Sequence, residues 1–296
     1  MKILLLDQGS QIGRALVELL ASHPGIDWSE MTAAQLSGPL DAATELIKEC
    51  RPNFIVNAYS IELAESEPGL SKAHVKRIKN LCRAAKSIGA TFVHVSSAQV
   101  FNGARGKVFF ESDRTKPKGS VSRRLVELEQ AVTRELDRHI VLRSGWLFGA
   151  YGQGAFQRFL RMLESDQEIV LDNVVEGAPT PAADVARVLL AIIQQLDCGA
   201  PCWGTYHYCS SDTTNSRDFF ETVMTMAVHY SNIDSAQILL AAPDDDITIG
   251  SRHPLLDCHA ILNTFGVKQR PWRSAMTGIL KNWYQQQPAG DSIAVD

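Results

Sequence analysis

Short apolar runs that alternate with amphipathic segments are the feature that most constrains how this chain can fold. Mainly apolar runs occur at residues 3–6, 54–56, 91–95 and 140–142, and each is the length of one strand. Between them lie segments with apolar residues at helical spacing, such as residues 11–21. Apolar strands that alternate with helices indicate βαβ units with helices on both faces of a parallel sheet. The sequence therefore predicts an α/β fold built on a doubly wound parallel sheet.

The rhythm of the sequence changes after about residue 149. Helical segments beyond this point are linked by short extended pieces and turn-rich stretches such as residues 176–181. We therefore predict a nucleotide-binding domain over residues 1–150 and a smaller α/β lobe over residues 151–284, partly interwoven with the first. The polar residues 285–296 are expected to form a flexible tail.

Charge balance and cysteine usage exclude several classes of protein. Lys and Arg number 29 against 33 Asp and Glu, a net charge of −4, which argues against a nucleic-acid partner. No apolar run approaches the roughly 18 residues of a membrane span, and no signal-peptide pattern is present. We expect a cytoplasmic protein with no membrane partner. Cys198, Cys202, Cys209 and His207 lack the spacing of a structural zinc site, so no metal is predicted.

A glycine-containing turn follows the first predicted strand and precedes the first predicted helix. A Rossmann-type fold binds a pyrophosphate in this place, because glycines allow close approach and the helix N-terminus offers N–H groups. The cofactor-binding candidates are Gly9, Ser10, Gln11, Ile12 and Gly13. In the spacing G-x-x-G-x-x-G, glycines would stand at positions 7, 10 and 13, and only Gly13 fits. Because Asp7 places a carboxylate near the phosphates, NAD(P) binding is possible but expected to be weak, and a turn kept only for packing is the alternative.

Several further segments resemble one known family in their order and spacing. The chain is similar to the dTDP-4-dehydrorhamnose reductases, a branch of the extended short-chain dehydrogenase/reductases, over about residues 1–284. The segments that carry the resemblance are residues 1–5, 51–58, 64–68, 93–103, 142–149, 177–180 and 265–273. The resemblance implies a Rossmann-type domain that binds NAD(P)H and a smaller C-terminal substrate-binding lobe for a nucleotide-sugar. In this family a hydride passes to the C4 ketone of the sugar.

The same resemblance places further residues at the site. It implies that Ala58 and Ser96 lie beside the cofactor and that Ser97 is the hydroxyl that holds the substrate oxygen. Arg252 stands near the family's substrate-binding Arg-Pro pair, where its planar guanidinium could bind a diphosphate. Trp146 lies where a strand leaves the sheet, and ligands of open α/β sheets bind beyond such strand ends. We therefore expect Trp146 and Arg252 to contact the substrate.

The chain departs from the family at the residues that move the proton. The family uses a Tyr as proton donor and a Lys four residues later, and these positions hold Val121 and Leu125. About three residues are also missing between Asn57 and Ala64, in the loop that would pass under the cofactor. These changes predict that the protein is not an enzyme but a ligand-binding or regulatory protein, with a nucleotide-sugar-like ligand, a protein partner or a homodimer. The alternative is an NAD(P)H-dependent nucleotide-sugar reductase with a displaced acid, such as Ser97 or a bound water.

Overall fold

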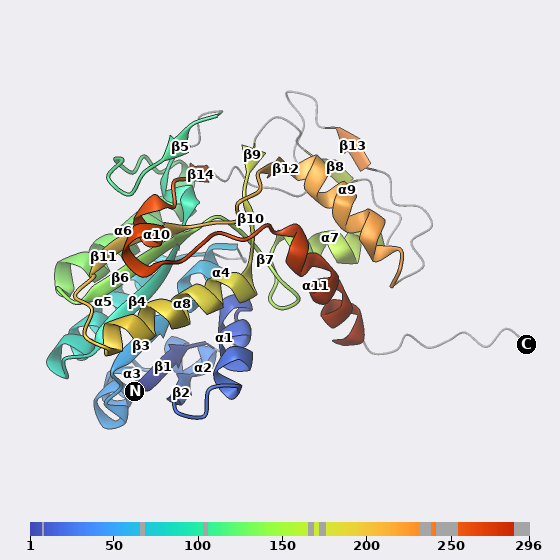
Figure 1. The fold of residues 1–296 in the computed structure, drawn as a ribbon. Helices are drawn as coiled ribbons and strands as arrows, with labels where there is room; N and C mark the ends of the chain where they lie inside the picture. The colour runs from blue at the N-terminus through green and yellow to red at the C-terminus, as the bar shows by residue number, and fades with distance from the viewer. Residues whose placement is uncertain are drawn as a thin grey trace, which may run out of the picture.

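A six-stranded parallel sheet forms the centre of the computed structural model (Figure 1). The structure describes residues 1–7, 9–65, 69–102, 106–164, 169–171, 176–230, 238–240 and 254–286. The sheet has the order β11-β6-β4-β3-β1-β2, and every neighbouring pair is parallel. Its strands are β1 (Lys2–Leu6), β2 (Asp27–Met31), β3 (Phe54–Asn57), β4 (Thr91–Ser97), β6 (His139–Ser144) and β11 (Gly204–Tyr208). The predicted doubly wound α/β fold is confirmed.

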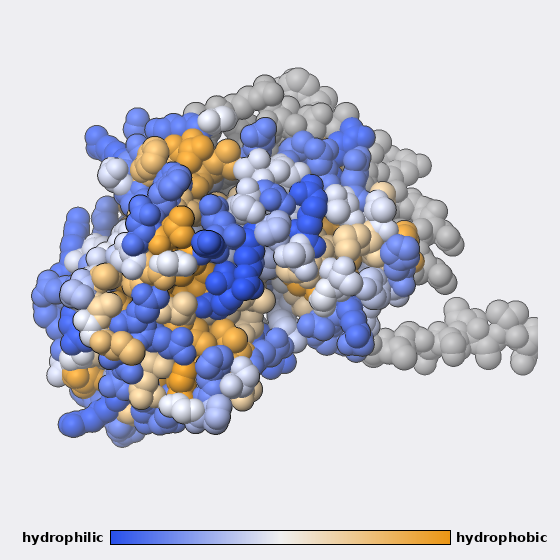
Figure 2. Space-filling model, viewed as in Figure 1, coloured by the Kyte–Doolittle hydropathy of each residue, from blue (hydrophilic) through white to orange (hydrophobic). Residues whose placement is uncertain are grey.

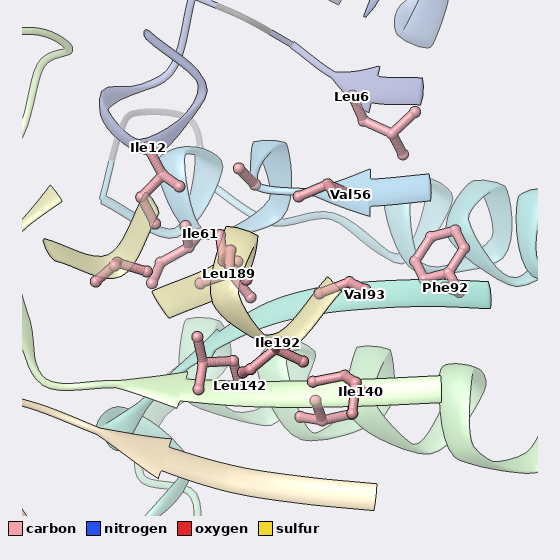
Figure 3. Packing of buried hydrophobic residues seen from close by; sticks show 14 of the residues in the cluster. Leu6, Ile12, Val56, Ile61, Phe92, Val93, Ile140, Leu142, Leu189 and Ile192 are labelled. Carbon is pink, nitrogen blue, oxygen red and sulfur yellow. The ribbon is translucent and has the colours of Figure 1, made fainter. Parts of the chain in front are cut away.

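Helices cover the sheet in two layers. One layer pairs α1 (Gln11–Ala21) with α8 (Ala182–Asp197), and the other packs α3 (Leu40–Cys50), α5 (Lys72–Ser87) and α6 (Gly119–Glu135) in a row (Figure 1). The side chains of β1 from Ile3 to Leu6 are fully buried, because helices cover both faces of that strand. The core continues into the helices, and Figure 3 shows Ile12, Ile61 and Leu189 gathered in one group.

The C-terminal lobe has a hydrophobic cluster of its own. It joins β7 (Trp146–Phe148) to α7 (Ala155–Leu163), α9 (Ser216–Ala227) and α11 (Arg273–Gln286), and β7 pairs with β10 (Pro179–Pro181). Three further two-stranded pairs are β5 (Val108–Phe109) with β14 (Leu255–Leu256), β8 (Ile169–Leu171) with β13 (Ile238–Leu240), and β9 (Glu176–Gly177) with β12 (Thr214–Asn215). Because β10 leads directly into α8, the chain returns from this lobe to the sheet.

Three short elements were not among the predicted helices. These are α2 (Ala33–Ser37), α4 (Tyr59–Glu65) and α10 (His259–Phe265). Helix α5 begins at Lys72, because the Ser71 hydroxyl accepts a hydrogen bond from the His74 amide and caps it. Helix α11 runs to Gln286, and the rest of the predicted tail lies outside the described residues.

The surface carries one apolar patch over β5 and β14. Figure 2 shows hydrophobic residues gathered at this place, and Val108 and Phe110 are 42% and 52% exposed there. In the described part of the chain, no helix is long and apolar enough to cross a membrane.

Candidate functional site

The order of the strands places the candidate site. Strand β1 lies between β2 and β3. From β1 the chain crosses to β2 on one side, and from β3 it continues to β4 on the other side, so the direction of strand order reverses next to β1. Ligands of open α/β sheets bind at this switch point, beyond the carboxyl ends of the strands. Here β1 leads into α1 and β3 leads into α4. The site is therefore built from the turn at residues 7–13 and the start of α4.

The connection from β1 to α1 contains few glycines and is held by side-chain hydrogen bonds. Asp7 takes a left-handed conformation with φ of 64°, as glycine does most readily and aspartate tolerates. Its Oδ1 atom accepts a hydrogen bond of 2.9 Å from the Gly9 amide. The Ser10 hydroxyl caps α1 by accepting a 3.1 Å bond from the Gly13 amide, and it donates to the Asp7 carbonyl. Polar side chains thus hold the turn where the family spacing would place glycines.

The N-terminus of α1 already has an anionic partner, which the sequence did not predict. The amide of Gln11 donates to Oε2 of Glu62 at 3.2 Å, and the amide of Gln153 donates to Oε1 of the same carboxylate at 3.2 Å. Burial raises the pKa of Glu62, the two amide bonds lower it, and the nearby Asp7 raises it further. The missing residues between positions 57 and 64 were the one sequence signal that α4 would lie close to the turn.

The segment after β7 packs over this contact. At Gly152, with φ of 86°, a Cβ atom would lie 2.6 Å from Oε1 of Glu62 and 2.5 Å from Cγ of Gln11. The Tyr151 hydroxyl donates to Oε1 of Glu18 at 2.5 Å, and the Arg14 guanidinium lies 5.3 Å from the Tyr151 ring centre. Residues 149–154 therefore close over the first turns of α1.

The predicted cofactor-binding residues divide into two groups. Gly9 and Ser10 immediately precede α1, whose first N–H groups are where a dinucleotide's pyrophosphate would bind. The Gln11 amide is held by Glu62, so a pyrophosphate fits only when that carboxylate moves away. Ile12 and Ala58 are buried in the core, and they can shape the site only through their backbone.

The two serines at the end of β4 face different neighbours. Ser96 was predicted beside the cofactor, but its hydroxyl donates to Oε1 of Glu129 on α6 at 2.6 Å inside the protein. Successive side chains of a strand point to opposite faces, so Ser97 faces away from Glu129. Its Oγ atom accepts a 3.2 Å bond from the Gln99 amide. Ser97, the hydroxyl predicted to hold the substrate oxygen, is the last residue of β4 and therefore lies at the carboxyl edge of the sheet.

The positions of the family's Tyr and Lys lie one turn apart on α6. Val121 is partly buried and packs against the main core, and Leu125 is fully buried. Neither side chain can donate a proton or carry a charge.

Of the two predicted substrate residues, Trp146 lies among the described residues. Trp146 is 4% exposed, and its ring centre lies 4.6 Å from that of Phe219 and 5.5 Å from that of Phe220. The prediction that Trp146 lines the substrate cleft is therefore wrong, because its ring fills the core of the C-terminal lobe. Arg252 lies outside the described residues.

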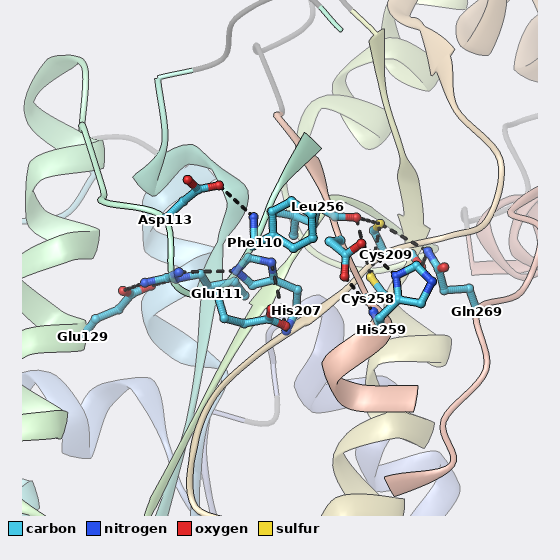
Figure 4. Close-up of polar contacts among 12 residues, drawn as sticks. Phe110, Glu111, Asp113, Glu129, His207, Cys209, Leu256, Cys258, His259 and Gln269 are labelled. Carbon is cyan, nitrogen blue, oxygen red and sulfur yellow. Dashed lines mark hydrogen bonds and ion pairs between the residues drawn. The ribbon is translucent and has the colours of Figure 1, made fainter. Parts of the chain in front are cut away.

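A buried ionic network fixes the carboxyl ends of β6 and β11 (Figure 4). Nε and Nη2 of Arg143 donate to the two oxygens of Glu129 at 2.9 and 2.8 Å, and Nη1 lies 3.3 Å from Nε2 of His207. The His207 amide donates to Glu111 at 3.0 Å. Burial, with the Arg143 charge, lowers the pKa of His207 to about 3. His207 is therefore neutral at neutral pH, and the network positions the strand ends.

A second buried polar group lies beneath α4. The Asn57 amide nitrogen lies 3.1 Å from Nδ1 of His94 and donates to the Ser60 hydroxyl at 2.9 Å. Ser60 Oγ lies 2.9 Å from Nε2 of His74. Burial lowers the pKa of His74 to about 4 and that of His94 to about 3, so both rings are neutral at neutral pH. These contacts tie α4 to β3, β4 and α5, and so fix the place from which Glu62 reaches the turn.

The cysteines considered for a metal are not gathered together. Cys209 lies beside Cys258 instead, with the two sulfur atoms 3.7 Å apart, as Figure 4 shows. Cys198 is exposed at the end of α8. Within the described ranges, no group of three or more His, Cys, Asp or Glu side chains is arranged to hold a metal ion.

The parallel sheet, the capped turn at its switch point and the return of the chain through α8 define a Rossmann-type α/β protein. The family described as RmlD substrate binding domain matches residues 1–285, and the chain belongs to this family. The resemblance inferred from the sequence is confirmed.

Relatives of known function support the same assignment. The chain is 26% identical over 293 residues to the dTDP-4-dehydrorhamnose reductase of Aggregatibacter actinomycetemcomitans, covering 94% of this chain and 98% of that one. It is 29% identical over 246 residues to the dTDP-4-dehydrorhamnose reductase of Sinorhizobium fredii, covering 77% and 80% of the two chains. The expectation of a protein that is not an enzyme is contradicted, because these relatives are named as enzymes.

Solved structures share the fold. The dTDP-4-dehydrorhamnose reductase of Bacillus anthracis, described in complex with NADP, matches with a TM-score of 0.78 and 20% identity, over 95% of this chain and 98% of that one. A dTDP-4-dehydrorhamnose reductase from Clostridium acetobutylicum matches with a TM-score of 0.75 and 20% identity, over 95% and 99% of the two chains.

Proposed function

We propose that the protein is an NAD(P)H-dependent reductase that acts on the 4-ketone of a nucleotide-sugar. The observation that carries this proposal is the match along nearly the whole chain to proteins named dTDP-4-dehydrorhamnose reductase. The connection from β1 to α1 supports it, because it lies at the switch point of the sheet, where dinucleotides bind in open α/β folds. Bound NAD(P)H would supply the hydride, residues 1–150 would hold it, and residues 151–284 would hold the sugar.

The proton must come from a group other than the family's tyrosine. Ser97 is the candidate, because it lies at the carboxyl end of β4 beside the switch-point edge of the sheet. It is 4% exposed, so this role requires the edge to open around it when the substrate binds. The Gln99 amide donates to its Oγ, which orients the hydroxyl and increases its acidity. Its O–H can then donate to the oxygen that forms on the reduced carbon, either directly or through a water molecule. A serine hydroxyl is a weaker acid than a tyrosine, so we expect slower turnover than the family's dyad gives.

The test is an assay of purified protein with dTDP-4-dehydrorhamnose and either NADH or NADPH. We expect the nicotinamide absorbance to fall while a reduced sugar nucleotide accumulates, identified by mass spectrometry. Ser97→Ala is expected to lower kcat by about 100-fold, the usual loss for a general acid. Ser211→Ala, an exposed serine, is the matched control and should leave kcat unchanged. Absence of product with both cofactors across a panel of 4-keto sugar nucleotides would overturn the proposed function.

A further inference from the structure

The carboxylate of Glu62 bridges two segments that are far apart in the chain. One oxygen accepts from the first helical amide of α1, at Gln11, and the other accepts from Gln153 in the segment after β7, each at 3.2 Å. The Glu62 side chain is partly buried: its bond to Gln11 is partly shielded from water, whereas its bond to Gln153 is exposed to it. A charged acceptor with two oxygens at a helix N-terminus makes the same kind of contact as a bound phosphate.

The surroundings of Glu62 are built to keep it in this place. Ile61, the preceding residue, is 3% exposed, and Figure 3 shows it beside Ile12 of α1. The buried contacts of Ser60 with Asn57 and His74 hold the first turn of α4 on the sheet. Helix α4 therefore cannot shift freely, and only the Glu62 side chain can rotate out of the contact.

The segment at residues 149–154 packs over the Glu62 carboxylate, and Gly152 allows this close approach. A Cβ atom on Gly152 would lie 2.6 Å from Oε1 of Glu62, closer than such atoms approach, and the backbone there has φ of 86°. Glycine is the residue that meets both conditions. The Tyr151 contacts with Glu18 and Arg14 hold the same segment against α1.

We propose that Glu62 is an affinity-determining residue that competes with the cofactor's pyrophosphate for the N-terminus of α1. The proposal rests on the proposed reductase function. A pyrophosphate and Glu62 need the same Gln11 amide, and their negative charges repel each other at this distance. The cofactor therefore binds only as Glu62 turns away, which also breaks the bond to Gln153 and releases the segment at residues 149–154. Part of the binding free energy is spent on this opening, so NAD(P)H binds more weakly than to a turn with a free amide.

Titration calorimetry with NADH and NADPH tests the competition. Glu62→Ala removes the competitor and is expected to tighten binding by about 10-fold, while Glu62→Gln keeps a neutral acceptor and should tighten it less. The matched control is Glu45→Gln, which removes one negative charge from the exposed face of α3 and should leave the affinity unchanged. Thermal unfolding of each variant verifies that it is folded.

A second measurement needs no cofactor. Amide hydrogen exchange of residues 9–13 and 149–154 should be faster in Glu62→Ala than in the unaltered protein, because both segments lose their shared acceptor. Unchanged hydrogen exchange would overturn the proposal. If a cofactor binds both Glu62→Ala and the unaltered protein, equal affinity for the two proteins would overturn it as well. Faster exchange with no binding of either cofactor by any variant would instead overturn the proposed reductase function, and with it the role of Glu62 in cofactor affinity.

Discussion

Acid is expected to destabilise the protein through three buried histidines. Burial lowers the pKa of His74 to about 4 and the pKa values of His94 and His207 to about 3. In the unfolded chain a histidine has a pKa of about 6.5. Below that pH the unfolded state binds protons that the folded state cannot bind, so stability is lost as the pH falls from about 6.5 toward 4.

The size of the effect follows from the same pKa values. At about pH 5 an unfolded histidine is almost fully protonated while the folded one is neutral, which costs about 2 kcal/mol for each ring. Three rings cost about 6 kcal/mol, comparable to the whole stability of a typical domain. Burial raises the pKa of Asp7 and of Glu111, and these groups act with the opposite sign. A single-residue comparison is therefore more informative than the total pH dependence.

The comparison uses His74→Gln, because glutamine can still bond to Ser60 but does not titrate. Urea unfolding is measured for both proteins at about pH 7.5 and about pH 5. Over this interval the variant is expected to lose about 2 kcal/mol less stability than the unaltered protein. His229→Gln, at an exposed histidine, is the control and should behave like the unaltered protein. Equal losses in His74→Gln and the unaltered protein would refute the claim that His74 is held neutral by burial.

Three other substitutions test separate parts of the structure. Glu129→Ala leaves the buried Arg143 charge without its carboxylate and should lower the free energy of unfolding by about 3–5 kcal/mol in urea; a loss below about 1 kcal/mol would contradict a buried pair. Asp7→Gly removes a carboxylate from a turn whose φ of 64° suits glycine, and should strengthen NADH binding by about 1 kcal/mol in calorimetry; unchanged affinity would show that Asp7 does not repel the cofactor. Val121→Tyr with Leu125→Lys introduces the family's Tyr and Lys; because Leu125 is fully buried, urea unfolding must first show that the variant folds. In a folded variant kcat should rise by about 100-fold, and no rise would show that the proton step is not limiting.

The sheet could be predicted because its signal is local. Runs such as residues 3–6 are apolar throughout, and this pattern requires burial on both faces wherever the strand lies. Helix α4 could not be predicted in the same way. It spans two turns, and among residues 59–64 Ile61 is the buried hydrophobic side chain, which is too little for a helical period to show in the sequence.

The site was harder to predict than the fold because its contacts join distant residues. Gln11 and Glu62 are 51 positions apart, and no spacing rule links them. Trp146 stands at a strand end, which favours a binding role, but the rings of α9 cover it in the folded protein. The relatives also contradict the functional expectation, because it rests on two side chains of α6, whereas the match to named reductases extends along 94% of the chain.

The bond between Glu62 and Gln153 has a thermodynamic consequence that extends beyond the turn. Residues 149–154 lead directly into α7, which belongs to the hydrophobic cluster of the C-terminal lobe. Displacing Glu62 would therefore release one of the connections between the sheet and the C-terminal lobe, another being the step from β10 into α8. Coupling between two binding events is reciprocal. A sugar nucleotide that draws this segment toward the C-terminal lobe would therefore strengthen cofactor binding, and the cofactor would strengthen the binding of the sugar nucleotide by the same factor. One carboxylate can thereby link the occupancy of the two halves of the molecule.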